Sequence, residues 1–363
     1  MVTGVEGIFT RARLEKLAFE QPLPEPMPAD TQAKAPALSV AMSVYDGERF
    51  LAPAIESVLA QTFEDFEFLI LDDGSRDSSL AIARHYAAID SRIRIISREN
   101  RGLVTSLNQL LAESRAPLVA RMDADDICLP ERFARQVAFL DANPDHGVVG
   151  SWSEDIDEFG RPFATGGRDH PVENAEFARA ILEDRNLLCH PAVTYRRDVV
   201  LSVGGYHRAY RHVEDHDLWL RLASVTKMAN LPMRLIRYRH YAGQVSSRHA
   251  TEQQIGHSVA LMAWRERQAG RPDPTAHIDA LPPLGQLDAL FGRDGVDREV
   301  RARLARALAF SRTSLAGDGF DHIMTHVQEG GDRVGLWRTA ARLVTFGMPG
   351  RAARLAAALV HAG

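Results

Sequence analysis

The sequence predicts an α/β fold, with a mainly parallel sheet covered by helices on both faces, followed by a C-terminal helical region. Between residues 38 and 143, short apolar runs alternate strictly with segments of helical periodicity. Such alternation is typical of a parallel sheet, because parallel neighbours must be joined by a crossover, which is usually a helix. Beyond about residue 250, arginine-rich helical segments are separated by Gly and Pro turns.

The individual elements follow from residue periodicity and turn residues. Continuous apolar runs bounded by turns indicate buried strands, and apolar residues three and four apart indicate helices. Pro130 suits the first turn of the fourth helix, where its missing N–H is not needed. The predicted strands are 38–44, 66–71, 93–97 and 118–122, and the predicted helices are 50–59, 78–88, 104–112 and 130–143.

The chain is predicted to have three parts. Residues 1–36 combine a short amphipathic helix with a linker that holds five prolines from Pro22 to Pro36, a composition that favours an extended chain. Residues 37–250 hold the alternating strands and helices, and residues 251–363 are expected to form a separate helical domain. A chain of 363 residues is more readily two folded domains than one.

Composition and charge narrow the function. The hydrophobic share of 45% and charged share of 25% are those of a soluble globular protein. A formal net charge of -5 argues against a nucleic-acid binder, which normally has a basic surplus. Cys128 and Cys189 are far apart, so we expect neither a disulfide framework nor a cysteine zinc site. No export signal or membrane span is evident, which predicts a cytoplasmic protein.

Two acidic clusters follow predicted strands, at the edge of the sheet where ligands bind in such folds. They are Asp72-Asp73-Gly74-Ser75 and Asp123-Ala124-Asp125-Asp126. Adjacent carboxylates repel one another unless something binds them. Three carboxylates in four residues form a hard oxygen site suited to Mg2+ or Mn2+, which can in turn hold a diphosphate. Turn chemistry at the first cluster and a solvated acidic loop at the second are the alternatives.

Five motifs in order resemble family 2 glycosyltransferases of the GT-A fold, over the stretch from about Leu38 to Ser246. Five ordered motifs are far more specific than any one of them. The motifs are Ser39-Val40-Ala41-Met42-Ser43-Val44-Tyr45-Asp46-Gly47, Asp72-Asp73-Gly74-Ser75, Arg98-Glu99-Asn100-Arg101-Gly102, Asp123-Ala124-Asp125-Asp126 and Glu214-Asp215-His216-Asp217-Leu218-Trp219-Leu220-Arg221.

The resemblance implies a nucleotide pocket beside the first strands. Ser43 and Tyr45 would line it, with the tyrosine ring stacked on the base. Asp72 and Asp73 would lie near uracil and ribose, where carboxylates accept from the imide N–H and sugar hydroxyls, and which of the two touches the base is open. Arg98 would meet the nucleotide or its phosphates, with an exposed surface arginine as the alternative.

The resemblance assigns the second acidic cluster to the metal. Asp125 is the expected direct ligand of Mg2+ or Mn2+, and Asp123 would face the ribose or the metal shell. Asp46 stands where the family usually has Asn, which adds negative charge to the predicted pocket.

A third acidic pair, Glu214-Asp215, opens a predicted helix. Acids in a first helical turn complement the helix dipole, so a purely structural explanation exists. In the family this motif provides the general base, and we expect Asp215 to take that role, with Glu214 as the neighbouring alternative. An acceptor hydroxyl is a poor nucleophile until its proton is removed, and such a base contributes about 100-fold to 10,000-fold.

These features predict an inverting glycosyltransferase that moves a sugar from a nucleotide-diphosphate donor, expected to be a UDP-sugar, to a hydroxyl of a saccharide or lipid-linked acceptor. The resemblance places such enzymes in surface polysaccharide or glycoconjugate synthesis. The alternatives are a non-catalytic sugar-nucleotide-binding or scaffold protein and a nucleotidyltransferase, whose glycine-rich, arginine-ended loop is missing. A dinucleotide-dependent dehydrogenase would need GxGxxG where residues 43–47 stand.

Two histidines and the C-terminal arginines have open roles. His190 precedes a strand-like segment, 192–195, and either faces the acceptor or is a satisfied structural histidine. His240 lies one residue before the place where the family usually has a histidine, and Tyr241 occupies that place. From Arg333 onward the chain has five arginines and no Asp or Glu. These basic helices are expected either to contact anionic lipid peripherally or to pack on the protein.

Overall fold

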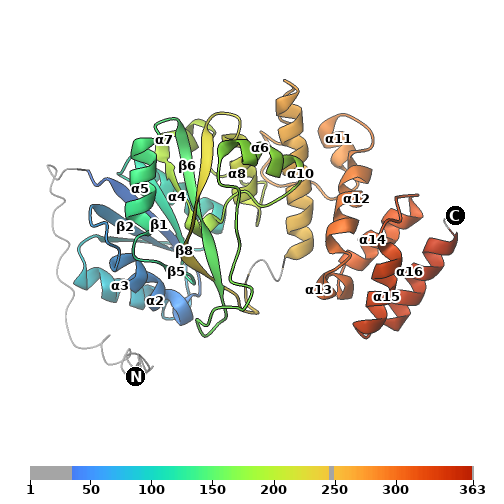
Figure 1. The fold of residues 1–363 in the computed structure, drawn as a ribbon, viewed down its shortest axis with the longest axis horizontal. Helices are drawn as coiled ribbons and strands as arrows, with labels where there is room; N and C mark the ends of the chain where they lie inside the picture. The colour runs from blue at the N-terminus through green and yellow to red at the C-terminus, as the bar shows by residue number, and fades with distance from the viewer. Residues whose placement is uncertain (1–34, 245–248, 362–363) are drawn as a thin grey trace.

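The computed structural model describes residues 35–244 and 249–361 of the 363-residue chain. Figure 1 shows a sheet flanked by helices, followed by a group of helices at the C-terminal end. The predicted N-terminal helix and nearly all of the proline-rich linker lie outside the described residues.

One eight-stranded sheet organises the first part of the fold, in the order β3-β2-β1-β4-β7-β6-β8-β5. The four predicted strands are confirmed, and they pair in parallel with β1 between β2 and β4. Parallel strands are covered on both faces, which accounts for their nearly continuous apolar sequence. The four are β1 (Leu38–Val44), β2 (Phe66–Asp72), β3 (Ile93–Ser97) and β4 (Leu118–Asp123).

The other half of the sheet is mixed. β7 pairs antiparallel with β4 and β6, β8 pairs parallel with β6, and β5 pairs antiparallel with β8. The sheet is therefore mostly parallel around the first acidic clusters and mixed beyond them. These strands are β5 (Ile127–Cys128), β6 (His146–Ile156), β7 (Thr194–Arg196) and β8 (Lys227–Arg239).

Side-chain alternation along β1 separates two buried cores. Val40 and Met42 belong to a core shared with α2, α3 and α5, whereas Ala41 belongs to a core shared with α4, α6 and α8. Helices cover both faces, as predicted, although α5 begins two residues after Pro130. The helices are α2 (Glu48–Leu59), α3 (Ser79–Ile89), α4 (Leu103–Glu113), α5 (Arg132–Ala142), α6 (Asn174–Leu182) and α8 (Glu214–Leu222).

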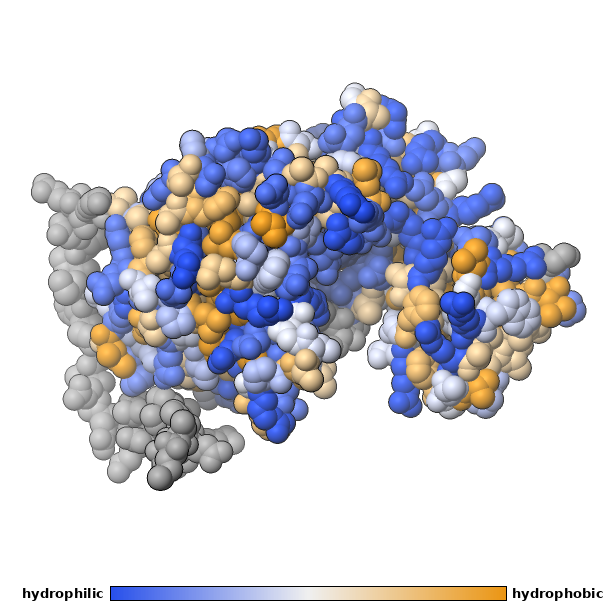
Figure 2. Space-filling model, viewed as in Figure 1, coloured by the Kyte–Doolittle hydropathy of each residue, from blue (hydrophilic) through white to orange (hydrophobic). Residues whose placement is uncertain are grey.

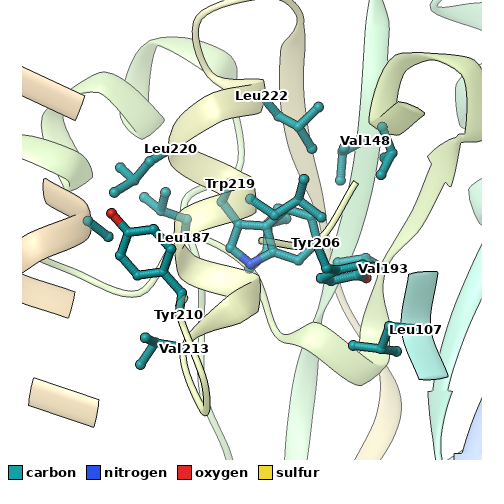
Figure 3. Close-up of a cluster of buried hydrophobic side chains, with 14 of the residues drawn as sticks. Leu107, Val148, Leu187, Val193, Tyr206, Tyr210, Val213, Trp219, Leu220 and Leu222 are labelled. Atoms are coloured by element: carbon teal, nitrogen blue, oxygen red, sulfur yellow. The ribbon is translucent and has the colours of Figure 1, made fainter. Parts of the chain in front are cut away.

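The larger core fixes α8, the helix that begins with Glu214 and Asp215. Figure 3 shows Trp219 of α8 among Tyr206, Val193 and Leu222. The indole is 1% exposed. Because α8 is only nine residues long, its position depends on this packing more than on helix propensity.

The same core continues into the C-terminal helices. α10 (Ala250–Gln268) contributes Val259, and α12 (Val296–Leu308) contributes Val300. α12 also contributes Ala305 to a third core with the helices that follow it. The domain division at residue 250 stays a prediction. The remaining elements are η1 (His190–Ala192), α7 (Arg197–Ser202), α11 (Leu287–Phe291), α13 (Arg312–Ala316), α14 (Gly319–Gln328), α15 (Leu336–Thr345) and α16 (Pro349–His361).

Several C-terminal arginines pack within the protein. Arg333 donates to the Leu359 carbonyl at 3.1 Å, and the Arg342 guanidinium lies 4.4 Å from the Phe310 ring centroid. On the face seen in Figure 2, hydrophilic side chains predominate and hydrophobic ones are scattered. Among the described helices, none is both long and apolar enough to cross a bilayer. Peripheral membrane contact stays a prediction.

Trp219→Ala should destabilise the fold by about 3–5 kcal/mol, because it leaves a cavity in the core under α8. The free energy of unfolding, measured by urea denaturation, tests this. Trp337→Ala is the matched control: its side chain is 52% exposed, and its loss should cost within about 0.5 kcal/mol. Equal losses in the two variants would contradict the packing described for α8.

Candidate active site

Strand register brings the first two acidic clusters to one edge of the sheet. Val44 of β1 is paired with Asp72 of β2, and Ser43 with Asp123 of β4. The carboxyl ends of the parallel strands β1, β2 and β4 therefore lie side by side, as expected for a ligand site in an α/β sheet. Ser43 is half-buried, and Tyr45, just past the end of β1, is 46% exposed.

Three carboxylates converge after β4. Asp123, Asp125 and Asp126 each place an oxygen within 4.8 Å of the others. One Asp126 oxygen accepts from the Arg239 backbone N–H at 2.8 Å, and the other is buried without a hydrogen-bond partner. The Arg239 side chain donates to the Asp125 carbonyl at 2.7 Å and so ties β8 to this loop.

This cluster fits a divalent metal. Burial and the charge of Asp123 raise the pKa of Asp125 to about 6. Burial and the charge of Asp125 raise the pKa of Asp126 well above its usual value. A bound cation strongly favours the ionised form of carboxylates that are crowded, desolvated and partly without partners. A set of oxygen ligands alone suits Mg2+ or Mn2+. Asp126, which the sequence placed in the motif without a role, belongs to this group.

The first cluster divides into two different side chains, both buried. Asp73 accepts from the backbone N–H groups of Arg101 and Gly102 at 3.0 and 2.9 Å and also pairs with Arg98. Asp72 accepts from the Ser75 N–H at 3.2 Å and the Ser97 hydroxyl at 3.1 Å. Asp73 thus holds the loop before α4, which leaves Asp72 the freer of the two.

Arg98 is not an exposed arginine. Its guanidinium donates to Gln109 at 2.8 Å, to Ser106 at 2.9 Å and to the Glu99 carbonyl at 2.9 Å, in addition to Asp73. These contacts connect the β2 edge to α4. A direct contact between Arg98 and a nucleotide stays a prediction.

The structure gives Asp46 a local role. Its φ of 49° lies in the left-handed region, which Asn and Asp tolerate better than most residues. Its carboxylate accepts from the Arg76 N–H at 2.7 Å, and its own N–H donates to Ser75 at 3.1 Å. Asp46 therefore joins the loop after β1 to the loop after β2 with the geometry that Asn would also provide.

The acidic pair at the start of α8 is strongly desolvated. Glu214 is 4% exposed, and one of its carboxylate oxygens is buried without a hydrogen-bond partner. Burial and the neighbouring Asp215 raise the pKa of Glu214 to about 8. Burial also raises the pKa of Asp215, against the opposing effect of His257. Asp215 accepts from the His216 N–H at 2.8 Å.

Arg121 interacts electrostatically with both the carboxylates after β4 and the acids at the start of α8. The sequence analysis did not identify this residue. It is 4% exposed and forms an ion pair with Asp123. Burial lowers the pKa of Arg121, but Asp123 outweighs this and holds it above the usual value. The positive charge of Arg121 also opposes the rise in the pKa of Glu214 and Asp215 that burial causes. The available signal was a charged residue inside the apolar strand 118–122.

The two histidines have structural partners. His190 is buried, and its Nε2 lies 3.0 Å from the Tyr206 hydroxyl. Burial lowers the pKa of His190 well below its usual value. His240 lies 3.2 Å from Asp155 and packs against Phe163.

Tyr241, next to His240, is the residue that reaches the acidic cluster. Its hydroxyl hydrogen-bonds to Asp125, and burial followed by the charge of Asp125 raises its pKa. The Tyr241 ring packs on Phe50 with ring centroids 5.0 Å apart. The position where the family usually has a histidine is therefore occupied by a hydroxyl donor.

Glu214→Gln should stabilise the protein more at about pH 8 than at about pH 5. The folded-state pKa of Glu214, about 8, lies above its usual value of 4.5. Between these values the folded state binds more protons than the unfolded state, so stability falls as pH rises. Glutamine removes this dependence because it is neutral at both pH values.

Urea unfolding at the two pH values measures the effect. Glu173→Gln makes the same change at an exposed site and should stay within about 0.5 kcal/mol of wild type at both. An effect of Glu214→Gln that does not change with pH would contradict the raised pKa.

Known proteins similar in sequence to this chain are named as glycosyltransferases. The family model described as glycosyl transferase family 2 matches residues 39–204, which include the first two acidic clusters but end before Glu214. The amylovoran biosynthesis glycosyltransferase AmsE of Erwinia amylovora is 34% identical over 217 residues, or 58% of this chain and 79% of AmsE. The O-antigen biosynthesis glycosyltransferase WbnJ of Escherichia coli is 31% identical over 206 residues, or 56% of this chain and 79% of WbnJ.

The fold has solved counterparts. The crystal structure of S. aureus TarS 1-349 in complex with UDP-GlcNAc matches with a TM-score of 0.55 and 17% identity, over 90% of this chain and 88% of that chain. At this identity the likeness shows the fold alone, which is the GT-A fold. With the sequence relatives and the family model, it leads to one assignment: the chain belongs to glycosyl transferase family 2 and is a glycosyltransferase.

Proposed function

We propose that this glycosyltransferase inverts the sugar it transfers, uses a divalent metal, and takes a UDP-sugar as its donor. The observation that carries the proposal is the placement of two acidic groups around Arg121. The carboxylates of Asp123, Asp125 and Asp126 suit the metal and diphosphate end of a displacement, and Asp215 suits the hydroxyl end. The positive charge of Arg121 interacts with both groups.

Asp125 and Asp123 would hold Mg2+ or Mn2+, with Asp126 orienting the loop through the Arg239 N–H. When bound, the metal would stabilise the negative charge that develops on the departing diphosphate. Arg121 would neutralise part of the carboxylate charge and so reduce repulsion within the cluster before a ligand binds. The Tyr241 hydroxyl holds Asp125 in place.

Asp215 is the better candidate for the general base. Glu214, with a pKa of about 8, is mostly protonated at neutral pH and is poorly suited to accept a proton. Asp215 would take the proton of the acceptor hydroxyl as its oxygen attacks the anomeric carbon. The bond from that carbon to UDP would break on the opposite face, so one displacement would invert the configuration.

The nucleotide would lie along the edge formed by β1 and β2. The exposed ring of Tyr45 is available to stack on the base, Ser43 is half-buried beside it, and Asp72 is the carboxylate with more capacity to accept from uracil or ribose. Asp73 and Arg98 would support this pocket through the loop before α4. TarS is described in complex with UDP-GlcNAc, which favours a UDP-sugar for this chain.

The setting we propose is polysaccharide or glycoconjugate synthesis, with a saccharide or lipid-linked acceptor. AmsE and WbnJ are named for amylovoran and O-antigen biosynthesis. Both are relatives over a little more than half of this chain.

Asp125→Asn should weaken binding of UDP in the presence of Mn2+ by at least about tenfold, since even outer-shell changes at metal sites typically cost about 10- to 100-fold. Isothermal titration of UDP with and without Mn2+ measures the effect. Asp198→Asn, an exposed position in α7, is the control and should bind as wild type. Unchanged Mn2+-dependent binding in Asp125→Asn would remove Asp125 from the metal site.

Asp215→Asn should lower turnover by about 100-fold to 10,000-fold while leaving UDP binding unchanged, because the amide cannot accept the acceptor proton. UDP release from candidate donors, measured with an acceptor that supports turnover by the wild-type enzyme, tests this. Glu214→Gln should retain more activity than Asp215→Asn. The reverse order would transfer the base role to Glu214.

A further inference from the structure

A basic cleft lies beside the proposed catalytic pair. It has a volume of about 520 Å³, within the usual range for small-molecule sites. Arg101 lines one wall, and Arg208 and Arg211 line the other, while Glu214 reaches the same cleft. The three arginines are exposed, and none has a carboxylate partner within 4 Å among the described residues.

The two walls are held at a fixed separation. Asn108 of α4 donates to the Tyr206 carbonyl at 2.8 Å and accepts from the Tyr206 N–H at 2.8 Å. Gly205 is required beside this pair, because its φ is +70° and an added Cβ would lie 2.6 Å from the Asn108 side-chain oxygen. Asp73 holds the Arg101 wall through the Arg101 and Gly102 N–H groups.

The first turn of α4 adds to the positive potential of the cleft. Residues 103–105 line it, and their N–H groups have no acceptor within the helix, as at any helix start. Gly102 provides no side-chain cap. Glu214 is the one acidic side chain that lines the cleft, and its raised pKa keeps it mostly neutral at neutral pH.

We propose that this cleft binds the acceptor, and that the acceptor carries a phosphate or diphosphate group held by Arg101, Arg208 and Arg211. Arginine binds phosphate through paired, charge-assisted hydrogen bonds, and these three arginines have no carboxylate partner among the described residues that would compete for their N–H groups. The acceptor hydroxyl would then lie near Asp215, which follows the cleft-lining Glu214 in the chain. This inference rests on the proposed function, because it takes the Glu214 end of the cleft as the hydroxyl end of the reaction.

Titration of the full chain with inorganic phosphate, in the presence of saturating UDP and Mg2+ at constant ionic strength, tests the proposal. Wild type should bind phosphate while UDP is bound. The double variant Arg208→Gln with Arg211→Gln should bind it at least about tenfold more weakly, since charge-assisted contacts are lost. Arg338→Gln, an exposed arginine of α15 far along the chain, should bind as wild type.

Three results would overturn the proposal. They are a lack of phosphate binding by wild type, an equal loss in Arg338→Gln, and a parallel loss of UDP affinity in the double variant, which would assign the cleft to the donor diphosphate. A failure of wild type to bind UDP with Mg2+ would instead count against the proposed donor site. Melting temperatures of both variants show whether they are folded.

Competition identifies the source of the phosphate. Phosphatidylcholine vesicles that carry polyprenyl phosphate, and glucose 1-phosphate in solution, are each added to the phosphate-bound protein. Displacement by the vesicles and not by plain phosphatidylcholine supports a lipid-linked acceptor, and displacement by glucose 1-phosphate supports a soluble one. Displacement by neither would overturn the assignment of the cleft to a phosphate-bearing acceptor.

Discussion

The buried guanidinium of Arg121 interacts electrostatically with two acidic groups, the carboxylates after β4 and the acids at the start of α8. A positive charge inside a strand is costly unless it is paired, and Arg121 is paired with Asp123 at the end of that strand. The same charge opposes the rise in pKa that burial causes in the acids at the start of α8. Without it, the desolvated carboxylates after β4 would lose a buried positive charge that favours their ionised forms. β4, the carboxylates after it and the acids at the start of α8 are thus coupled electrostatically through one side chain.

Hydrogen bonds also anchor the loops at the carboxyl ends of β1 and β2, where we propose that the nucleotide binds. Asp73 spends its acceptor capacity on Arg98 and on two backbone N–H groups of the loop before α4. Asp46 ties the loop after β1 to the loop after β2. These bonds leave fewer polar groups free for a ligand, and they fix the position of those that are, such as Asp72 and the exposed Tyr45. A rigid frame of this kind reduces the ordering cost of ligand binding.

Neighbouring charges distinguish Glu214 from Asp215, which are adjacent in sequence and both desolvated. Glu214 is desolvated and close to a like charge, so it holds its proton to higher pH. Arg121 favours the ionised form of both acids, whereas His257 favours that of Asp215. A pair of carboxyl groups whose environments differ can divide proton-accepting and electrostatic tasks.

The sequence by itself determined the four parallel strands, the helices between them and the placement of both acidic clusters at strand ends. Those features depend on local periodicity and on the rule that parallel strands end at one edge, so they are readable without distant contacts. Only the tertiary structure decided that Tyr241 meets Asp125, that Arg98 is internal, that Arg121 joins two acidic groups, and that β6 pairs with β8. Each of these depends on segments far apart in the chain, and on burial that changes a pKa, neither of which a sequence pattern records. The basic cleft beside Glu214 belongs to the same class, because its arginines come from two segments far apart in the chain that contacts such as Asn108–Tyr206 bring together.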